Sequence, residues 1–182
     1  MGYTIVDVPT ERTALVVEVP EAAAAVDAWL ERTAYAKPSN GVPAHVTVLY
    51  PFVPAADVDE ALLADLRALF AGLPSFAFEL RECRHFPAVL YLAPDPPGPF
   101  VALTEAVVAA YSAYPPYEGV FAEVVPHLTA AEGEHSALGR AEGEIRQSLP
   151  IAAEAREVVL LEELDPELGR WRTHSRLPLG PA

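Results

Sequence analysis

Hydrophobic residues occur in short blocks that alternate with amphipathic stretches along the first half of the chain. Residues Thr13 to Val19 are apolar and β-branched, which predicts a strand, and the alanine-rich stretch from Glu21 to Arg32 predicts a helix. After a loop rich in Pro, Ser, Asn and Gly, residues His45 to Val53 predict a second strand. A helix from about Val58 to Phe70 and a strand from Phe76 to Arg84 complete this half.

The second half repeats this order of elements. The pattern predicts strands at 89–93, 121–129 and 153–163 and helices at 100–113 and 136–149. Self-similarity at this long period indicates a duplicated unit, with lobe-forming repeats at roughly 13–84 and 88–164 and a closing strand at 170–177. We expect residues 1–182 to form a single domain of mixed helices and strands, with the helices outside a sheet whose other face is open.

Each half carries a histidine two residues before a threonine, in matching strands. Side chains alternate across a strand, so His45 and Thr47 point to one face, and His127 and Thr129 do the same. Tyr50 falls on the opposite face by this alternation, and we expect it to pack in the core. If the two halves are related by a pseudo-two-fold axis, both His/Thr pairs face one cleft.

Two histidines and two threonines suit the chemistry of a phosphate ester. Displacement at phosphorus needs a base for the attacking hydroxyl and an acid for the leaving oxygen, and histidine titrates near neutral pH and can serve as either. Threonine hydroxyls can donate hydrogen bonds to the non-bridging oxygens. This chemistry requires no metal, and no set of three metal ligands has convincing spacing, so we expect neither a metal nor another cofactor.

Composition narrows the class of substrate. Hydrophobic residues make up 52% of the chain, which suffices for one substantial core. The formal net charge of -14 disfavours long polyanions such as duplex DNA, whereas a small phosphodiester, a nucleotide or an RNA 3′ end fits better. The single cysteine, Cys83, rules out an internal disulfide. No leader or membrane-spanning stretch is evident, so we expect a cytoplasmic monomer.

The two motifs resemble those of a known superfamily. The segments HVTVLYPF from His45 and HLT from His127 are similar to the two signature motifs of the 2H phosphoesterases, which include 2′,5′-RNA ligase-like proteins and cyclic phosphodiesterases. The resemblance covers nearly the whole chain. It implies a bilobal α+β fold with a concave cleft between two antiparallel sheets, with His45 and His127 as the acid/base pair and Thr47 and Thr129 as phosphate donors.

The sequence departs from the RNA ligase-like pattern after the second motif. An arginine commonly follows there, but Thr129 is followed by Ala-Ala-Glu-Gly. The last strand could supply a substitute cation, because by alternation its arginines share one face, and we take Arg172 and Arg176 as candidates for binding an anionic group. Tyr35 and Tyr117 lie in or beside the loops that precede the motif strands, where they could stack on a nucleobase.

The sequence therefore predicts a metal-independent phosphoesterase that hydrolyses a 2′,3′-cyclic phosphodiester of a nucleotide or short RNA end. Two alternatives stay open: a ligase or transesterase acting on RNA ends, and a non-catalytic module that binds a nucleotide or phosphorylated metabolite. The residues alone do not assign the acid and the base between His45 and His127.

Overall fold

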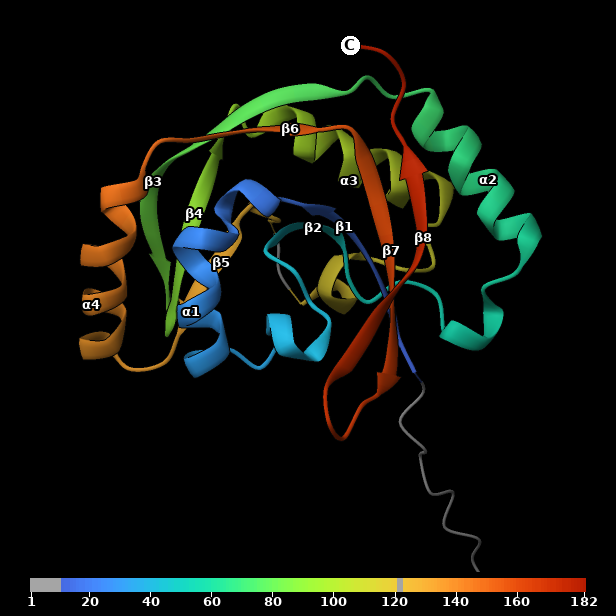
Figure 1. Cartoon of the computed structure of the whole chain (residues 1–182). Coiled ribbons are helices and arrows are strands. Elements are labelled where there is room, and N and C mark those ends of the chain that lie inside the picture. The colour runs from blue at the N-terminus through green and yellow to red at the C-terminus, as the bar shows by residue number, and fades with distance from the viewer. Residues whose placement is uncertain (1–10, 121–122) are drawn as a thin grey trace, which may run out of the picture.

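The computed structural model describes residues 11–120 and 123–182 and has the expected α+β class (Figure 1). The strands are β1 (Thr13–Glu18), β2 (His45–Leu49), β3 (Phe76–Phe86), β4 (Val89–Asp95), β5 (Leu128–Glu132), β6 (Ile151–Ala155), β7 (Glu157–Asp165) and β8 (Arg170–Pro178). The helices of more than one turn are α1 (Ala23–Thr33), α2 (Glu60–Ala71), α3 (Gly98–Ala110) and α4 (His135–Ile145). Among the described residues, no helix is long and apolar enough to cross a membrane.

All eight strands belong to one antiparallel sheet, in the order β6-β3-β4-β5-β2-β1-β7-β8. The expectation of two separate sheets is therefore corrected to one curved sheet with two halves. The halves meet at the motif strands β2 and β5, which share the single register pair Val46 and Leu128. The seam between the two halves is therefore short.

The chain crosses twice between the two halves of the sheet. Strand β3 lies beside β4, in the half that carries β5, whereas β7 lies beside β1, in the half that carries β2. The stretch 153–163, predicted as one strand, is two strands that break at Arg156, where the chain passes from one half to the other. The predicted strand 121–129 begins only at Leu128, and residues 121 and 122 of that prediction lie outside the described residues.

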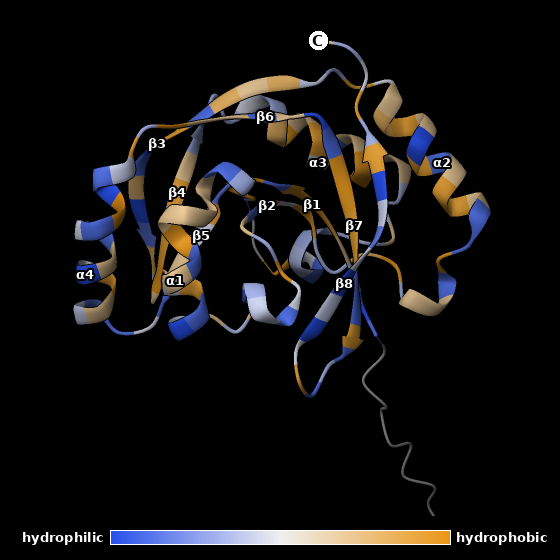
Figure 2. Ribbon diagram, viewed as in Figure 1, coloured by the Kyte–Doolittle hydropathy of each residue, from blue (hydrophilic) through white to orange (hydrophobic). Residues whose placement is uncertain are grey.

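The two faces of the sheet differ in what covers them. One face, which we call the helix-covered face, packs against all four helices, whose apolar residues recur every three or four positions, as with Leu63, Leu66 and Phe70 in α2. Figure 2 shows apolar residues along strands such as β4 and β7 and hydrophilic residues in α2 and α4. The other face, the open face, has only a small buried cluster of Ala14, Val16, Val42, Val159 and Leu161.

Candidate active site

The register of the two motif strands brings both His/Thr pairs to the open face. Val46 and Leu128 pair across the seam and are fully buried on the helix-covered face. Because side chains alternate along a strand, the motif residues that flank them point the other way. The four motif residues line one cavity of about 330 Å³ on the open face, which we call the cleft: His45, Thr47, His127 and Thr129.

The two histidine rings are held in equivalent ways. Nδ1 of His45 lies 2.7 Å from the carbonyl oxygen of Pro43, and Nδ1 of His127 lies 2.7 Å from that of Val125. A carbonyl oxygen only accepts hydrogen bonds, so Nδ1 of each ring carries the proton and donates it. In the neutral ring, Nε2 is therefore the unprotonated nitrogen and is ready to accept a proton.

Burial lowers the pKa of both histidines. Desolvation is the main cause for His45 and for His127, and each backbone hydrogen bond opposes the shift. The charge of His127 lowers the pKa of His45 further. Each ring thus favours the neutral form, and protonation of one disfavours protonation of the other.

Both predicted tyrosines line the cleft, in different settings. Tyr117 lies beside the first motif: burial raises the pKa of its hydroxyl, while a hydrogen bond with Thr47 lowers it. Its backbone N–H also donates to the carbonyl of Tyr50 at 2.7 Å. Tyr35 is largely exposed at the rim, where its hydroxyl donates to the carbonyl of Pro166 at 2.9 Å.

The two predicted arginines of β8 do not line the cleft and do not share a face. A bulge at His174 shifts the register, so Arg172 pairs with Glu162 while Arg176 pairs with Val159, a residue of the open face. Arg172 makes an ion pair with Glu162 at 2.7 Å. The expectation that these arginines supply the cation of the cleft is therefore corrected, because simple alternation fails across the bulge.

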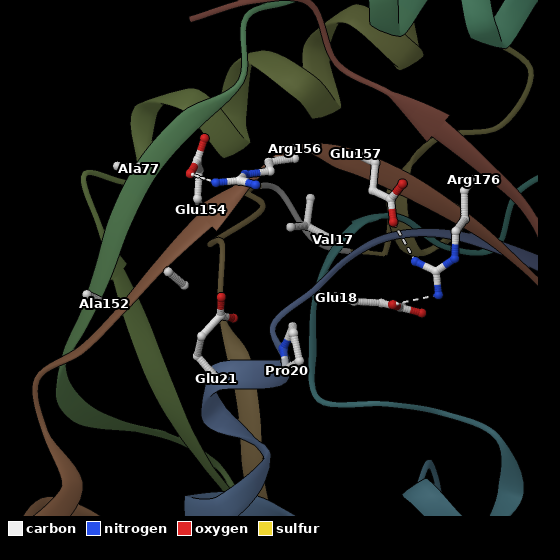
Figure 3. A pocket seen from close by; sticks show the side chains of 11 residues that line it. Val17, Glu18, Pro20, Glu21, Ala77, Ala152, Glu154, Arg156, Glu157 and Arg176 are labelled. Carbon is white, nitrogen blue, oxygen red and sulfur yellow. Dashed lines mark hydrogen bonds and ion pairs between the residues drawn. The ribbon is translucent and has the colours of Figure 1, made fainter.

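Arg176 instead lines a separate hollow of about 770 Å³, which is lined by residues of β3 and β6 from one half of the sheet and of β1, β7 and β8 from the other (Figure 3). There it contacts Glu157 at 2.5 Å and Glu18 at 3.0 Å, and Arg156 contacts Glu154 at 2.7 Å. Neither histidine of the motifs lines this hollow. Since carboxylates already neutralise both guanidinium groups, we do not assign it a phosphate site.

The cleft contains residues that the sequence did not single out. Arg12 immediately precedes β1, and Glu163 lies on the neighbouring strand β7. The backbone N–H of Glu163 donates to the carbonyl of Arg12 at 2.8 Å, and both residues line the cleft. Tyr50, expected in the core, also lines it, because the register shifts at Val48, where Leu49 pairs with Leu15 and Thr47 with Val16. Leu49 therefore joins the core, and Tyr50 turns to the open face. Trp171 lies beside Tyr50, with ring centroids 6.1 Å apart.

A second cavity of about 450 Å³ adjoins His127, and we call it the apolar recess. Phe86 and His127 form part of its wall, and Phe86 stacks on Tyr91 with centroids 4.2 Å apart. Both aromatic rings meet His127 edge to face. Among the described residues, no three His, Cys, Asp or Glu side chains come together as a metal site would require.

Comparison with known proteins identifies relatives of this arrangement. The family described as the 2′-5′ RNA ligase superfamily matches residues 18–167. Among solved structures, E. coli LigT complexed with NADP+ has a TM-score of 0.57 at 17% identity over 94% of this chain and 98% of that chain.

TT0787 of Thermus thermophilus has a TM-score of 0.60 at 21% identity over 93% of this chain and 98% of that chain. E. coli LigT complexed with 3′-AMP gives 0.57 at 16% identity over 94% and 99%. At such identities the likeness shows the fold alone. No curated relative matches the sequence.

Proposed function

The chain belongs to the 2′-5′ RNA ligase superfamily, and on that premise we propose that it is a phosphoesterase that hydrolyses a 2′,3′-cyclic phosphodiester. The observation that carries the proposal is the pair of equivalent histidines in one cleft, each with Nδ1 bonded to a backbone carbonyl and each beside a threonine. In such a pair, the neutral histidine can act as the base and the protonated histidine as the acid.

The reaction uses one singly protonated histidine pair. The neutral histidine accepts a proton at Nε2 from a water molecule as its oxygen attacks phosphorus. The protonated histidine gives its Nε2 proton to the ribose oxygen as the ring P–O bond breaks. One P–O bond forms and one breaks, so the product is a nucleoside monophosphate, and the proton lost by one ring equals the proton gained by the other.

The two threonines hold the phosphoryl group during this exchange. The hydroxyls of Thr47 and Thr129 would donate hydrogen bonds to the non-bridging oxygens of the phosphoryl group. These oxygens carry more negative charge in the transition state, so the hydrogen bonds are stronger there. Tyr117, through its hydrogen bond with Thr47, would fix the direction of that hydroxyl. No residue in this scheme depends on a metal ion.

The size and charge of the molecule favour a small substrate. A cleft of about 330 Å³ lies at the lower end of ligand sites and suits one nucleotide. The net charge of -14 opposes the binding of a long nucleic acid. Solved structures of E. coli LigT carry 3′-AMP, ATP or NADP+, which supports a nucleotide as the ligand of this fold.

The test is turnover of nucleoside 2′,3′-cyclic phosphates in the presence of EDTA, with products resolved by phosphorus NMR. We expect hydrolysis by the wild type and its loss in His45→Ala and in His127→Ala, by at least about a hundredfold each. His85→Ala is the matched control, because His85 forms an ion pair with Glu142 at 3.0 Å and does not line the cleft. Its rate should equal that of the wild type.

Other outcomes identify the alternative functions. Joining of RNA half molecules without hydrolysis of the cyclic phosphates would identify a ligase. Tight nucleotide binding with no turnover of any phosphodiester would identify a binding module. Full activity in either histidine variant would contradict the two-histidine mechanism.

A further inference from the structure

The cleft extends beyond the histidines along β1 into a slot with an apolar floor. The floor consists of Ala14, Val16, Val42 and Leu161, which are buried under the open face. Ala14 is small, so the slot has depth where a larger side chain would fill it. Tyr50 and Trp171 border the slot and meet at an interplanar angle of 61°. An apolar floor with aromatic borders suits a flat ring.

The far end of this slot is polar and rigid. Arg12 lies with its Nε 3.5 Å from a carboxylate oxygen of Glu163 and its guanidinium carbon 5.8 Å from the centroid of the Tyr50 ring. The Glu163 side chain is 3% exposed and that of Arg12 is 47% exposed. The carboxylate is thus buried beside a guanidinium that is half exposed and lines the cleft, where a ligand can reach it.

The strand register gives the separation between this end and the phosphate position. Val16 lies opposite Thr47, and Arg12 is four residues earlier, immediately before β1 begins at Thr13. Strands rise about 3.3 Å per residue, so the two backbone positions are about 13 Å apart. Arg12 is thus too far away to hold the reacting phosphate, but its long side chain reaches back over part of that distance. The remaining span fits a ribose and a base.

We propose that this slot binds the nucleobase of the substrate, with the base lying on Ala14 and Leu161, bordered by Tyr50 and Trp171, and an acceptor atom of its edge bonded to Arg12. The inference rests on the proposed function, and it names the group that the substrate must carry besides the cyclic phosphate. Glu163 acts as a positioning residue, since it holds the guanidinium and does not itself need to contact the ligand.

Two features favour a base in the slot over other arrangements. A second phosphate would meet a guanidinium whose charge Glu163 already offsets, whereas a carbonyl oxygen or ring nitrogen needs only the hydrogen bond. The apolar recess near Phe86 is lined by one of the two histidines, while the slot is continuous with both. The described residues that line the recess also include no arginine or lysine.

The experiment compares kcat/KM for the four nucleoside 2′,3′-cyclic phosphates with kcat/KM for methyl riboside 2′,3′-cyclic phosphate, which has no base. In parallel, calorimetry compares the affinities of nucleoside 3′-monophosphates with that of methyl riboside 3-phosphate. We expect the wild type to prefer ligands with a base by about tenfold or more in both measurements, because stacking and one hydrogen bond are lost without it.

Substitutions in the slot test whether the preference for ligands with a base arises there. Ala14→Leu fills the slot, and Arg12→Ala combined with Glu163→Gln removes the donor without leaving an unpaired buried carboxylate. Both should lower the preference for a base to within about twofold. Arg172→Ala, the matched control on the surface of β8, should keep it.

Three results would overturn the proposal: a wild type indifferent to the base, a preference that persists in both slot variants, or a preference lost only in Phe86→Ala, which would place the base in the apolar recess. Failure of the proposed function is a separate result. In that case no cyclic phosphate is hydrolysed, and the calorimetric comparison still decides whether the slot binds a base.

Discussion

Removal of one threonine hydroxyl from the cleft tests how the phosphate is held. Thr129 makes no side-chain hydrogen bond to any other described residue, so its hydroxyl is available to a ligand, and Thr129→Val removes the donor while keeping a β-branched shape suited to a strand. A hydrogen bond to a charged group is worth about 1.5–3 kcal/mol. At about 1.4 kcal/mol per factor of ten, kcat should fall by roughly 10- to 150-fold.

The assay is steady-state hydrolysis of a nucleoside 2′,3′-cyclic phosphate, with kcat and KM determined separately. The loss should lie mainly in kcat if the hydrogen bond strengthens as charge develops on the oxygen. Thr129→Ser restores the hydroxyl and should recover most of the rate. The Tm of Thr129→Val should stay within about 3 °C of the wild type, since a larger drop would mean that stability and not chemistry had changed.

A rate for Thr129→Val within threefold of the wild type would refute the reasoning. The double variant Thr47→Val with Thr129→Val adds a sharper criterion. If each hydroxyl holds a different oxygen, the two losses should multiply, whereas a double variant no worse than either single one would show that the hydroxyls act as a unit.

Three further predictions follow from the surroundings of the site. Because burial lowers the pKa values of His45 and His127, the singly protonated pair is most populated below their ordinary value, so kcat/KM should peak below about pH 6.5, and a peak at pH 8 would contradict this. Gly41 has φ +85°, and an added Cβ would lie 2.1 Å from the carbonyl oxygen of Trp171, so Gly41→Ala should cost at least about 1–3 kcal/mol in the free energy of unfolding, measured by urea denaturation, and should also lower kcat/KM. The side chain of Asp59 caps α2 far from the cleft, so Asp59→Ala should lower Tm by about 2–4 °C, measured by calorimetry, without changing kcat.

The sequence predicted the features that depend only on neighbouring residues within one helix or strand. The direction of His45 and Thr47 follows from alternation within a five-residue strand, and the buried partners Val46 and Leu128 follow from the same rule. The helices were predicted to within a few residues because their apolar positions recur every three or four residues. Tyr50 was placed wrongly because the pairing of β2 with β1 shifts at Val48, which reverses the alternation and sends Leu49 to the core and Tyr50 to the open face.

Features that depend on pairing between distant strands could not be predicted in this way. Arg12 and Glu163 meet because β1 pairs with β7, and nothing near either residue in the sequence indicates that pairing. The bulge at His174 turns Arg176 away from the face of Arg172, although an unbroken strand would have kept them together. The break at Arg156 moves the chain between the two halves of the sheet, so each half contains a strand from the other predicted repeat.

The surroundings of the two histidines, and not the rings themselves, determine which one acts as the acid and which as the base. Each ring has its Nδ1 proton fixed by a carbonyl two residues earlier, and burial lowers the pKa of each, so the rings themselves do not distinguish acid from base. Their neighbourhoods do differ. His45 lies on β2 opposite Glu18 of β1, while His127 meets the rings of Phe86 and Tyr91. The direction in which the cleft holds its substrate therefore determines which ring faces the leaving oxygen, and the residues that orient the substrate also determine the bond that is broken.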